Sequence, residues 1–252
     1  MEKEINIYLL RGLSRESEHW GNFGEYLNTN FPKSSIHYID MPGAGIYHQS
    51  KSPTSIPSIV ETLRSKELVQ TTNNLLIASS LGGMVALEWI SKYPNDFQFA
   101  TTICSSYKGI CNPRERFNLK FTFPILTFLL SSNVRRREKI ILRINSNHET
   151  IRKELIEQWV DIQHKRKLSK LNFMRQVLAG MRYAPVNPSI SIPLLIIGSK
   201  KDDLVKPNCI VKTHEQFGGT LKWHETAGHC VPIDEPKWLS DTIYEWLKTI
   251  DV

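Results

Sequence analysis

Short apolar runs with the length of β-strands recur along this chain, and segments that read as helices separate them. Six such runs stand out, at residues 5–10, 35–39, 74–79, 99–104, 193–197 and 221–224. Helices are expected at residues 19–30, 84–92 and 238–248. Strands that alternate with helices usually pair in parallel, because each helix carries the chain back across a face of the sheet. The sequence therefore predicts an α/β fold with a mostly parallel sheet of about six strands flanked by helices.

Residues 108–182 interrupt this alternation. They contain no convincing strand and read instead as three or four helices rich in Arg, Lys, Leu and Phe. From residue 101 to 182 there are 17 Lys/Arg and 6 Asp/Glu, a net charge of +11, whereas the whole chain carries +7. We predict a core formed by residues 1–107 and 183–252, with a basic helical cap inserted at residues 108–182.

Composition restricts the class of protein further. A chain of 252 residues that is 40% hydrophobic and 23% charged is typical of a globular protein with a large buried core. No uncharged apolar run approaches the ~18 residues that span a bilayer, and the N-terminal segment reads as a strand instead of a signal peptide. The cysteines stand singly, with no C-x-x-C pair or zinc-finger spacing. We expect a cytoplasmic protein with reduced thiols, no metal and no cofactor.

A candidate nucleophile lies where the third apolar run passes into a helix with almost no loop. Such a turn strains its central residue, so the positions two before and two after that residue must be small. Ser80 has Ala78 and Gly82 at these positions, whereas the neighbouring Ser79 has an isoleucine and a leucine. The backbone N–H of Leu81, at the start of the helix, would point toward the oxygen of a tetrahedral intermediate. The alternative is that Ser80 is only a helix N-cap.

A carboxylate and an imidazole suitable as partners follow later in the chain. Asp202 and Asp203 both come just after the strand predicted at residues 193–197, on the edge where α/β sheets bind ligands. Either aspartate could instead make local hydrogen bonds in a turn. His229 follows a glycine in a loop after the last predicted strand, a setting that none of the other seven histidines shares.

The order Ser, Asp, His is the order of the α/β-hydrolases, and the whole chain resembles that family. Leu-Leu-Arg-Gly at 9–12 stands where His-Gly usually follows the first strand, and Asp-Met-Pro-Gly-Ala-Gly at 40–45 is similar to the Asp-Leu-Pro-Gly-x-Gly loop. Asp-x-x-Val at 202–205 and Gly-His at 228–229 complete the pattern. The resemblance implies a triad of Ser80, Asp202 and His229. It prefers Asp202 to Asp203 because Asp202 is the residue three before the valine.

The resemblance also implies an oxyanion hole formed by the backbone N–H groups of Leu13 and Leu81. The chain departs from the family pattern at Arg11, which stands in the histidine position. A guanidinium at the pocket floor could bind substrate by pairing with a carboxylate or by adding positive potential, or it could simply pack at the surface.

Apolar side chains in the predicted cap, among them Phe121 and Phe123, are candidates for binding an acyl chain. Packing of the cap against the core explains them equally well. The basic residues favour a solvated face or a docking surface for an acidic acyl-carrier protein over contact with anionic membrane lipids. No nucleic-acid motif accompanies the charge. The general layout is similar to that of esterases that cleave pimeloyl carrier-protein methyl esters, although no diagnostic motif is shared.

We therefore predict a serine hydrolase that cleaves a carboxylic ester or thioester of a modest-sized, largely apolar acyl group. A serine nucleophile argues against the dehalogenase and epoxide-hydrolase branches of the fold, which use aspartate. One alternative is a carbon–carbon bond hydrolase with the same triad. Another is a non-catalytic binding protein that docks acidic partners through its basic cap.

Overall fold

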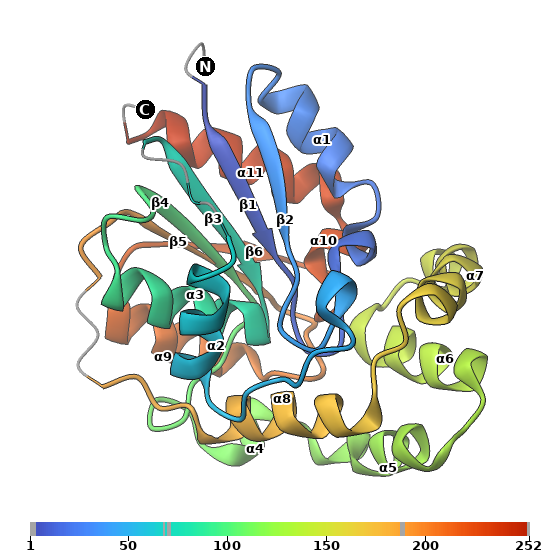
Figure 1. The fold of residues 1–252 in the computed structure, drawn as a ribbon. Helices are drawn as coiled ribbons and strands as arrows, with labels where there is room; N and C mark the ends of the chain where they lie inside the picture. Colours follow the sequence, from blue (N-terminus) through green and yellow to red (C-terminus); the bar gives the residue numbers. More distant parts are fainter. Residues whose placement is uncertain (1–3, 68, 70–71, 187–189, 251–252) are drawn as a thin grey trace.

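The computed structural model describes residues 4–67, 69, 72–186 and 190–250. Its centre is a six-stranded sheet in which all neighbouring strands are parallel, in the order β2-β1-β3-β4-β5-β6 (Figure 1). The strands are β1 (Asn6–Leu10), β2 (Ser35–Ile39), β3 (Asn74–Ser79), β4 (Phe99–Ile103), β5 (Leu194–Ser199) and β6 (Thr220–His224). The prediction of an α/β fold with a mostly parallel sheet of about six strands is confirmed.

The strand register aligns the carboxyl ends of β1, β2 and β3. Leu10, the last residue of β1, pairs with Ile39 of β2 on one side and with Ala78 of β3 on the other. The segments that follow these three strands therefore leave the sheet at the same edge. This edge is where open parallel sheets bind their ligands.

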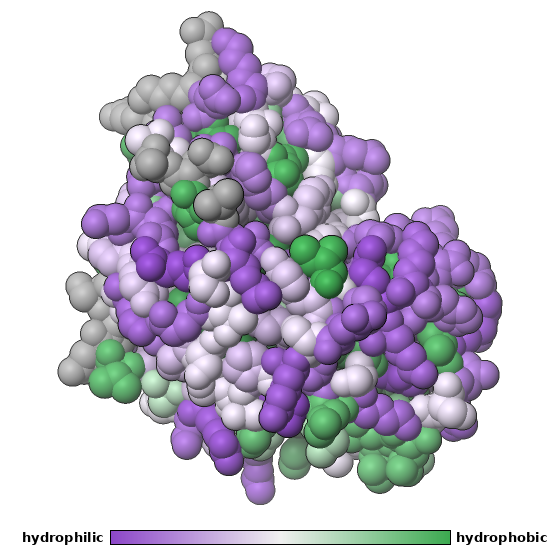
Figure 2. Space-filling model, in the orientation of Figure 1, coloured by the Kyte–Doolittle hydropathy of each residue, from purple (hydrophilic) through white to green (hydrophobic). Residues whose placement is uncertain are grey.

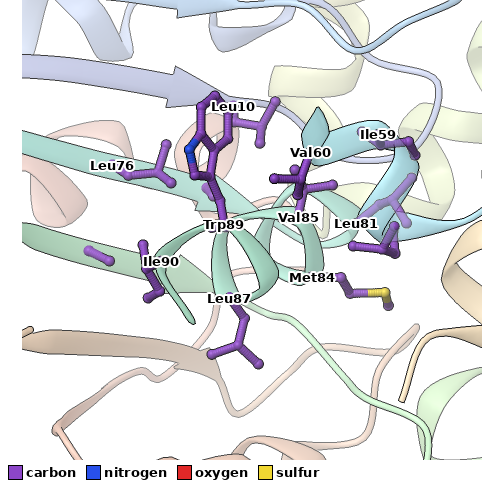
Figure 3. Close-up of a cluster of buried hydrophobic side chains, with 14 of the residues drawn as sticks. Leu10, Ile59, Val60, Leu76, Leu81, Met84, Val85, Leu87, Trp89 and Ile90 are labelled. Atoms are coloured by element: carbon purple, nitrogen blue, oxygen red, sulfur yellow. The ribbon is translucent and has the colours of Figure 1, made fainter. Parts of the chain in front are cut away.

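Each face of the sheet packs against its own helices, because side chains alternate between the faces along a strand. Tyr8 and Leu10 belong to the core cluster that includes α2 (Ile56–Arg64), α3 (Leu81–Lys92) and part of α9 (Pro207–Phe217). Figure 3 shows this cluster around α3, with its large indole at Trp89. Ile7 and Leu9 belong to the opposite cluster, which includes α1 (Phe23–Asn30) and α11 (Pro236–Lys248).

The helix predicted over residues 19–30 is confirmed at residues 23–30, and the prediction is wrong for residues 19–22. The segment is divided into a 3-10 helix, η1 (Ser17–Trp20), and the helix α1, with Gly21 between them at a φ of 58°. The Glu16 amide donates to Nδ1 of His19, which fixes the first turn separately from the second. Trp20 and Phe23 are spaced as in one helix, but they belong to two short elements. Their rings pack together in the core, with centroids 5.4 Å apart.

A group of helices is inserted between β4 and β5 and lies beyond the carboxyl edge of the sheet (Figure 1). These inserted helices are α4 (Pro113–Arg116), η3 (Leu119–Phe121), α5 (Thr122–Leu130), α6 (Val134–Asn145), α7 (Glu149–Lys165) and α8 (Lys170–Arg182). Their buried residues Phe128, Leu142, Trp159 and Phe173 form a hydrophobic cluster that also includes Ala44, Cys230 and Ile233 of the core. In the described parts of the chain, no helix combines the length and the apolar character needed to cross a bilayer.

Buried polar contacts attach the inserted helices to the loop that follows β1. The guanidinium of Arg15 donates to the Glu138 carboxylate of α6 at 2.7 Å, and both side chains are at most 4% exposed. Glu16, in the same loop, accepts hydrogen bonds from Arg166 at the end of α7. Gln176 of α8 accepts from the backbone N–H of Ser14. The loop after β1 is therefore held by three of the inserted helices.

We expect Glu138→Gln to lower the free energy of unfolding by about 3 kcal/mol, because it leaves the Arg15 charge buried without a counter-charge. The matched control is Glu157→Gln, which breaks an Arg–Glu pair in the same segment whose side chains are 48% and 62% exposed. That change should cost less than about 1 kcal/mol. Urea unfolding followed by circular dichroism measures both, and equal losses would contradict a structural role for the buried pair.

Candidate active site

Ser80 occupies a sharp turn between β3 and α3. Its φ of 56° lies in the left-handed region, which is unfavourable for a residue with a side chain. Its amide donates to the Ile103 carbonyl of β4 at 2.8 Å, so the neighbouring strand holds the turn. Gly82 permits the close approach that the turn requires: a Cβ there would lie 2.6 Å from the carbonyl oxygen of Leu10 and 2.7 Å from that of Arg11. The strained turn thus places the Ser80 hydroxyl at the carboxyl end of the sheet.

The structure brings Ser80, His229 and Asp202 together in one hydrogen-bonded chain. Nε2 of His229 lies 2.9 Å from Oγ of Ser80, and Nδ1 of the same ring lies 2.8 Å from Oδ2 of Asp202. A carboxylate accepts hydrogen bonds, so Nδ1 carries the ring proton and Nε2 is left to accept the serine proton. His229 is 3% exposed and Asp202 5%. The Ser80 oxygen therefore faces the ring nitrogen that carries no proton, and the hydrogen bond to Asp202 fixes the orientation of the ring.

The two adjacent aspartates have different surroundings. Oδ1 of Asp202 accepts from the backbone N–H groups of Leu204 and Val205, at 2.8 and 3.0 Å, so both of its carboxylate oxygens are used. Asp203 is exposed and pairs with Lys120 at 2.7 Å. The valine in Asp-x-x-Val thus supplies an amide that orients the first aspartate.

The histidine loop is held by a residue that sequence reasoning missed. Asp234, in α10 (Val231–Asp234), accepts from the Gly228 amide at 2.6 Å and also from the Ser146 hydroxyl and the Asn147 amide. The latter two residues belong to the link between α6 and α7. Nothing in the sequence marks Asp234 except its position five residues after His229, so its role became visible only from the contacts. The inserted helices and the imidazole are therefore joined through one carboxylate.

The segment after β1 lies directly against the serine turn. A Cβ at Gly12 would be 2.9 Å from Cβ of Ser80 and 3.6 Å from the amide nitrogen of Leu81. Glycine is therefore required for this approach. It brings Gly12, the residue before the second predicted oxyanion donor Leu13, next to the amide of Leu81.

Arg11 points into the interior of the protein. It is 3% exposed, its Nη2 lies 3.2 Å from Sγ of Cys230, and its guanidinium lies 4.9 Å from the centroid of the Trp20 ring. Within the described ranges, Nε and Nη1 have no protein acceptor. The Arg11 guanidinium therefore contacts Cys230, the residue next to His229, from within the core.

A cavity of about 630 Å³ lies between the inserted helices and the aspartate loop. It is lined by Lys120, Phe121, Phe123, Pro124, Thr127, Arg136, Ile140, Arg143, Ile144 and Asp203. Phe121 and Phe123, the aromatic residues predicted to bind substrate, both contribute to its wall. Asp203 connects the cavity to the aspartate that orients the imidazole, although Ser80 itself is not in the lining. The walls are largely apolar, and three cations lie at their edges.

Cys104, immediately after β4, is a buried neighbour of Asp202 and His229. One ligand atom each of Cys104, Asp202 and His229 lie within 4.8 Å of one another, the spacing of groups that can share a metal ion. Burial raises the pKa of the Cys104 thiol well above its ordinary value, and the negative charge of Asp202 raises it further. A protonated thiol is a poor metal ligand, and the aspartate and histidine already bond each other. The cluster therefore fits a hydrogen-bonded triad better than a metal centre.

A parallel sheet with a strained serine between strand and helix, followed in order by aspartate and histidine at the same edge, defines an α/β-hydrolase. Comparison of the sequence with known families agrees. Residues 3–236 match the family model described as serine aminopeptidase, S33 (Hydrolase_4), and the chain belongs to this family of hydrolases.

The chain is also similar to individual proteins. It is 29% identical over 105 residues to a pimeloyl-[acyl-carrier protein] methyl ester esterase from Hamiltonella defensa subsp. Acyrthosiphon pisum (strain 5AT), which covers 42% of this chain and 38% of that relative. The structure of esterase RhEst1 from Rhodococcus sp. ECU1013 superposes with a TM-score of 0.73 at 15% identity, covering 98% of this chain and 91% of the other. An enol-lactonase from Burkholderia xenovorans LB400 gives 0.76 at 14% identity, covering 98% and 92%. These two structures share the fold.

We expect Gly82→Ala to destabilise the protein by about 2–3 kcal/mol, because the added methyl group meets two backbone carbonyl oxygens that cannot move aside. Gly180→Ala in α8 is the matched control. There the new Cβ meets the flexible end of the Leu81 side chain at 2.8 Å, and alanine favours the helix by about 1 kcal/mol. Chemical denaturation should show a large loss for the first variant and a change within about 1 kcal/mol for the second. The reverse order would contradict the close-packed turn.

Proposed function

We propose that the protein is a serine hydrolase that cleaves a carboxylic ester or thioester of a modest-sized, largely apolar acyl group through an acyl-enzyme on Ser80. The observation that carries the proposal is the position of His229, within hydrogen-bond distance of both the Ser80 hydroxyl and the Asp202 carboxylate. Membership in a hydrolase family and similarity to an esterase support it.

In the proposed mechanism, Oγ of Ser80 attacks the carbonyl carbon while Nε2 of His229 takes the hydroxyl proton. The carbonyl oxygen becomes an oxyanion, which the N–H groups of Leu13 and Leu81 stabilise. Asp202 keeps the ring proton on Nδ1 and stabilises the imidazolium by its charge. When the intermediate collapses, the bond to the alcohol or thiol breaks, and His229 gives its proton to that leaving group.

Water then completes the cycle. His229 removes a proton from a water molecule that attacks the acyl-enzyme, and the second tetrahedral intermediate releases the carboxylic acid and returns the proton to Ser80. Each step uses side chains and amides of this chain alone. The apolar wall that contains Phe121 and Phe123 supports an acyl substrate over a sugar or a phosphate.

The proposed enzyme acts in the cytoplasm. Cys104, Cys111, Cys209 and Cys230 are all buried and form no disulfide. Unpaired thiols of this kind are typical of proteins in a reducing compartment.

The proposal is tested by labelling with a fluorophosphonate, followed by mass analysis of the peptides, with Ser80→Ala and Ser79→Ala as matched variants. We expect the wild type and Ser79→Ala to be labelled at residue 80 and to hydrolyse nitrophenyl esters, with a preference for apolar chains. Ser80→Ala should be unlabelled and slower by a factor on the order of 10⁴ or more. A folded wild type that takes no label would be a binding protein instead. Preferred cleavage of a vinylogous diketone would favour carbon–carbon bond hydrolysis.

The adjacent aspartates offer a second test. Asp202→Asn should lower kcat by about 10⁴, because the amide no longer fixes the imidazole tautomer. Asp203→Asn removes only an exposed ion pair with Lys120, and kcat should change by less than about fivefold. Steady-state kinetics on a short nitrophenyl ester distinguishes the two. If Asp203→Asn were the more severe change, the assignment of the acid would be incorrect.

A further inference from the structure

The outer surfaces of α5, α8 and the neighbouring η3 expose large apolar side chains to solvent. Seven of the eleven exposed large hydrophobic residues in the described chain lie here. We call these seven residues the apolar face: Leu119, Phe123, Leu126, Leu130, Leu171, Met174 and Met181. Phe123 is 76% exposed and Leu130 74%. Figure 2 shows hydrophobic residues gathered along the lower edge of the molecule, over α5 and α8.

The apolar face is a consequence of how the two helices pack. Phe128 of α5 lies inward against Phe173 of α8, with ring centroids 4.8 Å apart, so the buried sides of both helices are already occupied. A surface helix usually presents polar residues on its other side. Here Phe123, Leu126 and Leu130 follow one another at helical spacing on the solvent side of α5, a helix that has no charged residue.

Unpaired cations surround the apolar face. Residues 113–130 and 170–182 contain six Lys/Arg and one Asp/Glu, a net charge of +5, and the one acid, Glu115, is held by Lys212 at 2.9 Å. Within the described residues no acidic partner or hydrogen bond is found for the cations Arg114, Lys170, Arg175 and Arg182. The acids of the inserted helices are instead concentrated on α7, which carries Glu149, Glu154, Glu157 and Asp161.

We propose that the apolar face is a docking surface for an anionic lipid membrane. Exposed aromatic and aliphatic side chains flanked by Lys and Arg match the interface of a bilayer, where the apolar groups enter the acyl boundary and the cations meet acidic headgroups. A protein carrier with an acidic surface would satisfy the cations, but it would not account for the protruding side chains of Phe123, Leu130 and Met174. Charge alone favoured an acidic carrier protein over a membrane, and the exposure of these apolar residues reverses that preference.

The cavity lies next to the apolar face. Phe123 belongs both to the apolar face and to the lining of the cavity, where Lys120, Arg136 and Arg143 also contribute. A membrane against α5 would therefore lie beside the cavity, and an acyl chain could pass from one apolar environment to another. Membrane docking itself does not depend on hydrolysis, so it is measured on the Ser80→Ala variant.

The experiment is flotation of the full chain, as Ser80→Ala, with vesicles of phosphatidylcholine alone and of phosphatidylcholine with about 30% phosphatidylserine. We expect binding to the anionic vesicles and weak binding to the neutral ones. The double change Phe123→Ser with Leu130→Ser should reduce partitioning at least tenfold, since each side chain loses its apolar burial. Val211→Ser, at an exposed apolar position on α9, is the matched control and should bind like the parent.

Charge is tested with a pair of double variants of equal net charge. Lys170→Gln with Arg182→Gln should weaken binding to anionic vesicles by about 25-fold, because each cation at such a surface contributes about fivefold. Lys153→Gln with Lys165→Gln, on α7, should change binding little. Circular dichroism and thermal unfolding check that each variant is folded.

Three results would overturn the proposal. The first is a protein that floats with neither kind of vesicle. The second is binding to a purified acyl-carrier protein that the Lys170→Gln and Arg182→Gln changes abolish, without any binding to vesicles. The third is sedimentation as a dimer that the Phe123→Ser and Leu130→Ser changes convert to a monomer, because a second copy of the chain would then cover the face.

Discussion

The strained turn at Ser80 is the constraint on which the site depends. A side chain at a φ of 56° is unfavourable, and here it is maintained by the hydrogen bond from Ser80 to β4 and by the contact of Gly82 with the end of β1. Both supports come from strands adjacent to β3 in the sheet. The parallel register therefore forms the core and also provides the rigid edge that holds the Ser80 hydroxyl in place.

The inserted helices are part of the same arrangement and not a separate cover. Asp234 joins the His229 loop to the link between α6 and α7, while the Arg15–Glu138 pair joins α6 to the loop after β1. Both contacts are buried, so moving the helices away would expose or unpair charged groups at a substantial cost in free energy. The geometry of the imidazole is thus coupled to the packing of a segment that contains none of Ser80, Asp202 and His229.

The polar and apolar surfaces of the inserted helices are distributed unevenly. The hydrophobic cluster shared with the core takes one side of α5, α6, α7 and α8, and α7 carries most of the acids. On α5 and α8 the solvent side remains apolar and its neighbours basic. Such exposure lowers solubility and is usually retained for binding, which is why this surface, and not the net charge alone, carries the docking proposal.

The sequence by itself determined the architecture and the identity of the triad candidates. Strand-like runs alternating with helices predicted the parallel sheet, and the small residues at positions 78 and 82 distinguished Ser80 from Ser79, because both signals arise from local sterics and periodicity. Helical spacing failed at residues 19–22, where Gly21 breaks the segment and the aromatic pattern is shared by two elements. Only the tertiary structure decided how Asp202 differs from Asp203, and that Arg11 lies between Trp20 and Cys230. It also decided that Asp234 holds the loop before His229 and that Cys104 lies near the imidazole. These are contacts between residues far apart in the chain, and a single sequence carries no record of which distant groups meet at the edge of a sheet.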